Sequence, residues 1–223
     1  MTHFGALGVL CGVLGTSLLG AGELSTYRGF QFGMDLSAAA KQAGVEASEA
    51  RLVHQRPAVI QELEWQPSVF RNSRSADPIR DGLLSFYKGE LFRIVVTYDR
   101  DRVEGMTPDD MIVAVSATYG IATRPKAEIA YHSNYAEVAP VLARWEDSQY
   151  SYNLVRSGYG DSFAMVMYSK RLDALAAAAI AEAARLDATE APERAIEATR
   201  KQQQDDRLAL DKARLVNAPN FRP

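Results

Sequence analysis

Hydrophobic and polar residues alternate with a period of two through the middle of the chain, which predicts an antiparallel sheet. The clearest segment is a hairpin of Leu83–Tyr87 and Glu90–Tyr98, joined by Lys88-Gly89, where the glycine supplies the positive φ of a tight turn. The second arm places Phe92, Ile94, Val96 and Tyr98 on one face and Arg93 and Thr97 on the other. We therefore expect a sheet with one buried face and one face in water.

The same alternation predicts five more strands, at residues 27–33, 58–65, 141–147, 150–155 and 162–169. Between the predicted strand 58–65 and the hairpin, residues 68–81 contain Asn, Ser and Pro without periodicity. This composition predicts a mobile loop.

Three helices have recognisable ends or faces. Asp35 is a suitable N-cap for a helix over 36–43, which Gly44 closes. Thr107-Pro108-Asp109-Asp110 opens a second helix over 107–119. A third begins near Lys170, and its apolar positions recur at the helical period: Leu172, Leu175, Ala176, Ala179, Ala183 and Leu186.

The order strand-strand-strand-helix occurs twice, which predicts an α+β fold. We expect antiparallel sheet from two β-β-β-α units, covered by helices 107–119 and 170–190, with the 35–43 helix at one edge. We assign residues 23–191 to the globular domain, with halves at 23–120 and 138–191, and residues 192–223 to a charged helical arm with a loose C-terminus. The pattern leaves open whether the halves form one sheet or two.

The arm favours helix but has no apolar stripe. Pro192 either begins a new helix or kinks a continuous one. Ion pairs at i,i+4, such as Glu190–Arg194, Glu197–Lys201 and Arg207–Asp211, can each contribute about 0.2–0.5 kcal/mol. A helix that is polar all round is solvated, bridging or only marginally formed. The arm is therefore interpreted either as a solvated spacer or as a segment that folds against a partner. Its weak apolar periodicity argues against self-association through 192–216, which remains an alternative.

Residues 1–22 contain no Lys, Arg, Asp or Glu, and residues 4–20 are almost wholly apolar. An apolar run ending in Gly20-Ala21-Gly22 is typical of a cleaved signal peptide. The alternative is an uncleaved N-terminal membrane anchor, for which the run is short and rich in glycine. We therefore predict export to the periplasm or the cell exterior, with no stable membrane span after cleavage.

Cysteine usage and charge exclude several function classes. Cys11 is the only cysteine, so cleavage after Gly22 would leave a chain without disulfides, thiolate metal sites or cysteine nucleophiles. The net charge is −3, and Lys and Arg form no cluster. We therefore expect no nucleic-acid partner.

Candidate catalytic residues are few. After cleavage the histidines are His54 and His132, both predicted in connecting segments, and no Gly-x-Ser-x-Gly elbow is present. An envelope hydrolase using His54 or His132 is therefore the weaker hypothesis. Glu62 and Glu64 fall on one face of one strand and are interpreted as its solvated side rather than a catalytic pair. We expect no metal site and no cofactor.

A group of aromatic residues is the most prominent candidate binding feature: Trp145, Tyr150, Tyr152, Tyr159 and Tyr168. Exposed together, they would form a platform for a peptide or a sugar ring. The simpler interpretation is that they belong to the core, because burial is the usual state of such residues.

Residues 28–44 (RGFQFGMDLSAAAKQAG) and the meander that follows resemble the small outer-membrane-assembly lipoproteins of the SmpA/OmlA type and the related β-lactamase-inhibitor-like modules. The matching features are Gly33-Met34-Asp35 and the helix after them. The resemblance implies a fold and a function in binding another protein, with no catalysed reaction. We therefore predict a non-enzymatic protein-binding or scaffolding module of the cell envelope, with another envelope protein as partner.

Overall fold

The computed structural model describes residues 22–67, 77–130, 138–156, 162–220 and 222. Eight strands form one antiparallel sheet in the order β3-β4-β5-β6-β10-β9-β8-β7. Their bounds are β3 Arg51–His54, β4 Ile60–Trp65, β5 Ile79–Tyr87, β6 Glu90–Tyr98, β7 Glu128–Ala130, β8 Val138–Glu146, β9 Tyr150–Arg156 and β10 Phe163–Ser169. The sheet joins two meanders, β3–β6 and β7–β10, through the pairing of β6 with β10.

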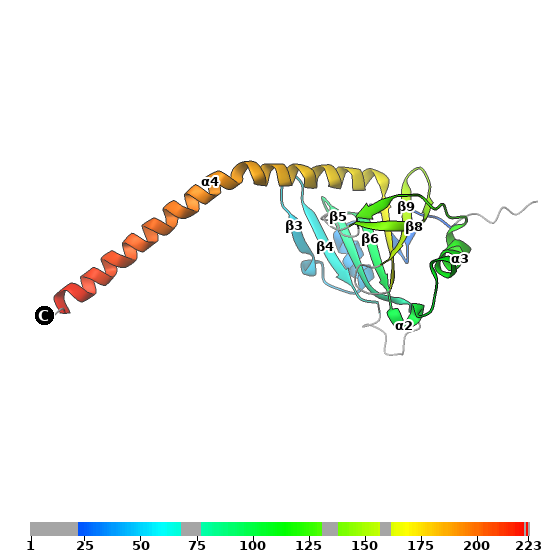
Figure 1. Ribbon diagram of the computed structural model, residues 1–223, viewed down its shortest axis with the longest axis horizontal. Coiled ribbons are helices and arrows are strands. Elements are labelled where there is room, and N and C mark those ends of the chain that lie inside the picture. Colours follow the sequence, from blue (N-terminus) through cyan, green and yellow to red (C-terminus); the bar gives the residue numbers. More distant parts are fainter. Residues whose placement is uncertain (1–21, 68–76, 131–137, 157–161, 221, 223) are drawn as a thin grey trace, which may run out of the picture.

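The α+β fold predicted from the sequence is confirmed, and the two halves form one continuous sheet. The first meander is followed by helices α2 (Arg100–Val103) and α3 (Pro108–Tyr119), and the second by α4 (Lys170–Asn217). Each meander has four strands rather than three, because the short edge strands β3 and β7 lie in segments without clear alternation. Figure 1 shows α4 leaving the sheet and projecting far beyond it.

The hairpin of β5 and β6 is confirmed, and both turn residues, Lys88 and Gly89, have positive φ. Strand β5 begins at Ile79, so the predicted loop 68–81 is wrong at its end, and residues 68–76 lie outside the described residues. A register shift between Ser85 and Phe86 marks a bulge in β6, whose extra, unpaired residue is Phe92. Leu91 and Ile94 therefore lie in the main core, whereas Phe92 packs with Leu172 of α4.

The prediction that one face of the sheet lies in water is wrong. Arg93 is 1% exposed and Thr97 is 4% exposed, on the face expected to be solvated. The first turns of α4 cover this face through Leu172 and Ala176. The sheet also curls: β7 is at its far edge, yet the Ala130 carbonyl oxygen of β7 accepts a hydrogen bond from Arg93 of β6. Long-range packing thus buries polar positions whose spacing is typical of an exposed face.

The main core lies on the other face, under α3 and an N-terminal layer. The predicted strand 27–33 is instead a small hairpin of β1 (Thr26–Tyr27) and β2 (Phe30–Gln31), because Arg28 and Gly29 both have positive φ. Helix α1 (Leu36–Ala43) follows as predicted, with Asp35 accepting from the Ala38 N–H and Gly44 left-handed at its end. A 3₁₀ turn, Ala47–Glu49, leads into β3.

Helix α3 begins at a capping box. The Thr107 hydroxyl accepts from the Asp110 N–H at 3.2 Å, and the Asp110 carboxylate accepts from the Thr107 N–H at 2.8 Å. The helix ends at Gly120, as predicted. Its buried residues, Met111 and Ile112, join the main core.

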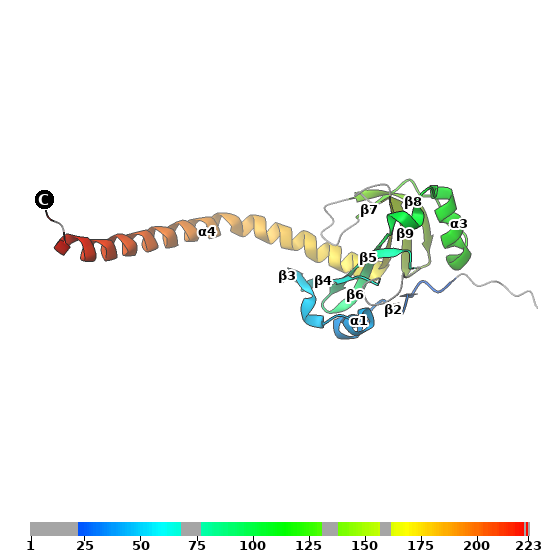
Figure 2. The same cartoon turned by 90° about the horizontal axis from the view of Figure 1, so that it is seen from below.

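Helix α4 is continuous for 48 residues and contains Pro192, so it extends about 72 Å at 1.5 Å per residue. Its first part, 170–190, which we call the stem, packs on the sheet through Leu172, Ala176, Ala179 and Ala183, whereas Leu175 is exposed. Residues 192–217 form the arm, which extends from the body in both views (Figures 1 and 2). A 3₁₀ turn, Ala218–Asn220, follows. Among the described residues, no helix is both long and apolar enough to cross a membrane.

Candidate functional site

The arm is the most exposed element of the described chain. Every residue from Ala191 to Asn220 is exposed. Five large aliphatic side chains are among them, each between 51% and 76% exposed: Ile196, Leu208, Leu210, Leu215 and Val216. The helix therefore holds these side chains in water, away from the core that stabilises the rest of the fold.

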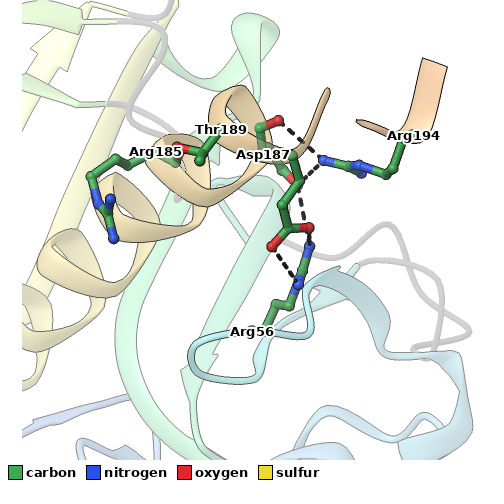
Figure 3. Close-up of polar contacts among 6 residues, drawn as sticks. Arg56, Arg185, Asp187, Thr189 and Arg194 are labelled. Atoms are coloured by element: carbon green, nitrogen blue, oxygen red, sulfur yellow. Dashed lines mark hydrogen bonds and ion pairs between the residues drawn. The ribbon is translucent and has the colours of Figure 1, made fainter. Parts of the chain in front are cut away.

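An ion-pair cluster ties the start of the arm to the sheet (Figure 3). Arg56, in the connection between β3 and β4, binds the Glu190 carboxylate with both guanidinium nitrogens, one of them at 3.0 Å from Oε1. Asp187 lies 3.9 Å from Arg56 and 2.9 Å from Arg194. We call these four residues the clamp. It connects the last turns of the stem to a loop 134 positions earlier in the sequence.

The clamp lies around Pro192, which is inside α4. Proline has no N–H, so it cannot donate to the carbonyl one turn earlier in the helix, and its ring pushes that turn open. The Arg194 guanidinium donates to the Asp187 carbonyl oxygen at 3.1 Å. The bond that Pro192 cannot make is the one to the Ala188 carbonyl oxygen, so the Arg194 bond lies on the carbonyl next to it and adds a polar contact at the turn where proline interrupts the backbone bonding.

We expect Arg56→Ala to lower the amide protection of residues 187–194 without unfolding the sheet. The Arg56 hydrogen bond lowers the pKa of Glu190 below its usual value. A lowered folded-state pKa means that the stabilisation is present above the unfolded-state pKa and is lost as pH falls through the folded-state pKa. Protection factors from hydrogen exchange should therefore differ between wild type and variant at neutral pH and converge in acid.

The matched control for this experiment is Arg185→Ala. Arg185 pairs with Glu182 within the stem and contacts no part of the sheet through that pair. Its loss should leave the protection of 187–194 near the wild-type level. Equal effects of the two substitutions would show that the clamp adds nothing beyond helix-surface pairing.

A second feature is an open hollow of about 720 Å³ beside the C-terminal end of α3. Its lining includes Trp145 and Tyr150, together with Tyr119, Ile121, residues 22–25, Gln31 and residues 146–149. Trp145 is 2% exposed and is held by its indole N–H, which donates to the Gly120 carbonyl oxygen at 3.0 Å. Tyr150 is half-buried and stacks on Phe32.

The candidate aromatic residues do not lie together on the surface. Tyr152 is fully buried, and its hydroxyl donates to the Thr26 carbonyl oxygen at 2.8 Å. Burial raises the pKa of Tyr152 well above its ordinary value, so the hydroxyl stays a donor. Tyr168 is on the opposite face of the sheet, over Arg93. Tyr159 lies outside the described residues. Of the four described, Trp145 and Tyr150 line the hollow.

The candidate chemical residues are dispersed. His54 is half-buried in the edge strand β3, and His132 lies outside the described residues. Glu62 is buried and paired with Arg51, contrary to the predicted solvated side, whereas Glu64 is exposed. Within the described part of the chain, no group of three His, Cys, Asp or Glu residues is placed to hold a metal ion.

Sequence reasoning missed Arg56 and Asp187, and it paired Glu190 with Arg194 rather than with Arg56. The one available signal was Pro192, which marks the point where the helix needs outside support. Comparison with protein-family models, with curated proteins and with solved structures finds no match to this chain.

Proposed function

We propose that the protein is an exported, non-enzymatic binding or scaffolding module of the cell envelope, and that its arm contacts another envelope protein. The observation that carries the proposal is the arm itself, a helix whose residues are all exposed and which presents five aliphatic side chains to water. Most helices in folded proteins are stabilised by packing an apolar side. A partner that covers these side chains would supply that packing.

The charges of the arm favour a protein partner. Residues 192–217 contain six basic side chains, Arg194, Arg200, Lys201, Arg207, Lys212 and Arg214, and five acidic ones, Glu193, Glu197, Asp205, Asp206 and Asp211. Interspersed charges of both signs suit a surface with complementary charges, such as a partner helix. They do not form the uniform basic stripe that nucleic acid or an anionic bilayer attracts.

The clamp supports the same proposal, because it holds the base of the arm against the body. A rigid base fixes the direction in which the arm projects, which lowers the entropy lost when a partner binds. The resemblance of residues 28–44 to the SmpA/OmlA-type lipoproteins also supports a role in binding rather than in catalysis. The second meander departs from that resemblance, so it leaves the partner's identity open.

The test is affinity capture from native envelope extract with chains that start at Glu23. We expect the chain ending at Pro223 to retain a specific partner, and the chain ending at Ala191 to lose it. Leu208→Glu with Leu215→Glu should also abolish capture. Gln204→Glu is the matched control, since it adds a negative charge to the arm without removing an aliphatic side chain. Equal capture by the full and shortened chains would overturn the proposal.

A second candidate is a peptide- or carbohydrate-binding role for the hollow beside Trp145 and Tyr150. The observation in its favour is that a half-buried aromatic ring lines an open hollow whose walls combine apolar side chains with polar ones. Tyr150→Ala would then weaken ligand binding while the chain ending at Ala191 keeps it. The opposite pattern is expected if the arm is the binding element.

A further inference from the structure

The hollow beside the C-terminal end of α3 is acidic. Its walls include the carboxylates of Glu23, Glu146 and Asp147, and no Lys, Arg or His is among the described residues that line it. The chain as a whole is nearly balanced, with 25 basic and 28 acidic side chains. The hollow is therefore more negative than the composition of the protein predicts.

The three carboxylates differ in their partners. Lys170 pairs with Glu146 at 2.7 Å and also donates to the Asp147 carbonyl oxygen, so it balances the charge of Glu146. The Glu23 carboxylate accepts from the Ser25 hydroxyl, which brings no charge. In the described part of the chain, no basic side chain forms an ion pair with the Asp147 carboxylate.

The turn between β8 and β9 fixes the position of the Asp147 carboxylate. Its Oδ1 accepts the N–H of Gln149 at 2.6 Å and the N–H of Tyr150 at 2.7 Å. Both bonds end on the same oxygen, so Oδ2 accepts no hydrogen bond from the described residues. A donor that binds to Oδ2 meets a group that is already ordered, which lowers the entropy cost of binding.

The ring of Tyr150 lies on the same turn. It is half-buried and stacks on Phe32, with the ring centroids 5.5 Å apart and the planes at 22°. Tyr150 also lines the hollow. Cations are attracted to the face of a tyrosine ring. The β8–β9 turn thus offers a negative oxygen and an aromatic surface close to one another.

The negative charge of the hollow reaches the core beneath it. The Tyr119 ring lines the hollow and packs edge-on against Tyr152, with the centroids 4.9 Å apart. Burial is the main cause of the raised pKa of Tyr152, and Tyr119 and the carboxylates of Asp147 and Glu23 raise that pKa further. A hollow with this charge favours a ligand that carries a positive group.

We propose that the hollow binds an arginine side chain of another polypeptide. A guanidinium is planar, so it can lie on the Tyr150 ring while its N–H groups donate to the Asp147 carboxylate. The ammonium of lysine lacks this plane and should bind more weakly. The proposal rests on the second candidate role given above, for which it names the ligand.

The size and charge of the hollow favour an arginine within a peptide over the free amino acid. A volume of about 720 Å³ exceeds that of one side chain, so neighbouring residues of a peptide also fit. Free arginine carries an α-carboxylate, which the acidic walls repel. An arginine inside a chain has no such group.

Neither signal cleavage nor the arm alters these contacts. Asp147 and Tyr150 lie on the β8–β9 turn, so cleavage after Gly22 leaves both in place and adds one α-amino group beside the Glu23 carboxylate. Figures 1 and 2 place α3, β8 and β9 at one end of the molecule and the tip of the arm at the other. The hollow and the arm can therefore be tested separately.

The test is an NMR titration of the chain that starts at Glu23 with an acetylated and amidated Gly-Arg-Gly tripeptide. We expect the amide signals of Gln149 and Tyr150 to shift, because their N–H groups bind the Asp147 carboxylate. Asp147→Asn should weaken binding about tenfold or more, since it removes the charge, while its amide oxygen can still accept the two turn bonds. Tyr150→Leu should weaken binding about two- to fivefold.

Glu64→Gln is the matched control, because Glu64 is an exposed carboxylate on β4 that does not line the hollow. It should leave the Kd unchanged. The same tripeptide with citrulline in place of arginine keeps the shape without the charge and should not bind. Free arginine should bind more weakly than the tripeptide does.

The proposal is overturned if the citrulline peptide binds as tightly as the arginine peptide, or if Asp147→Asn leaves the Kd unchanged. It is also overturned if N-acetylglucosamine shifts the signals of Gln149 and Tyr150 and the arginine peptide does not. The chain ending at Ala191 should bind the peptide as the full chain does. Failure of the arm to capture a partner would therefore leave this result unaffected.

Discussion

Asp173→Ala is expected to lower the free energy of unfolding by about 3–5 kcal/mol, because it leaves a buried charge without its main partner. The Arg93 side chain donates to the Asp173 carboxylate at 2.9 Å through Nε and at 2.6 Å through Nη2. Arg93 is 1% exposed, so water cannot replace the lost carboxylate. Urea denaturation followed by circular dichroism measures the change.

Two variants separate the charge effect from general damage. Arg93→Met with Asp173→Leu removes both charges and should cost less than Asp173→Ala alone, since no buried charge is left unpaired. Asp205→Ala, on the exposed arm, should be near neutral. A loss below about 1 kcal/mol for Asp173→Ala would show that this pair behaves as a surface pair and that α4 is held by its apolar contacts.

This ion pair has a consequence for the arm. Asp173 lies in the first turn of α4, and the clamp lies near the end of the stem, so the helix is tied to the sheet by polar contacts at both ends of its packed part. The buried residues of the stem are one leucine and three alanines, and the partly buried Ile180 packs beside them. Small side chains bury little apolar area. A stem of this length would be expected to be held by its apolar packing. Because that packing is small, the direction of the arm depends strongly on these two polar contacts.

Local signals in the sequence were sufficient for several elements. The β5–β6 hairpin, the caps of α1 and the capping box of α3 each depend on residues within a few positions of one another. Such interactions are specified by neighbouring residues, and here they agree with the global fold. The predicted boundaries of these elements are therefore close to the observed ones.

The errors come from contacts between distant segments. The positions of Arg93 and Thr97 have the alternation of a solvated face, but α4 and the curl of the sheet cover them. The bulge at Phe92 places its side chain on the opposite face of the sheet from the one that simple alternation predicts. In the N-terminal hairpin, Arg28 takes a positive φ, which is uncommon for a residue other than glycine. In the clamp, Arg56 and Glu190 are 134 positions apart.

Trp145→Ala is expected to lower the free energy of unfolding by about 3–5 kcal/mol, through loss of a large buried ring and the cavity it leaves. Trp145 is 2% exposed and belongs to the main core. Its indole N–H also donates to the Gly120 carbonyl oxygen, where α3 ends. The substitution should therefore loosen α3 as well, which lower amide protection over residues 111–119 would reveal.

Two milder variants show how much of the lost stability comes from the buried ring and how much from its hydrogen bond. Trp145→Phe keeps most of the ring and should cost less, with about 1 kcal/mol of the loss from the missing hydrogen bond. Tyr150→Ala, on the same hollow but half-buried, should cost less than Trp145→Ala. If Trp145→Ala left stability nearly unchanged but removed binding of a peptide or sugar, the ring would be part of a recognition surface. Burial predicts the reverse, so Trp145 is expected to position α3 and the rim of the hollow rather than to bind a ligand.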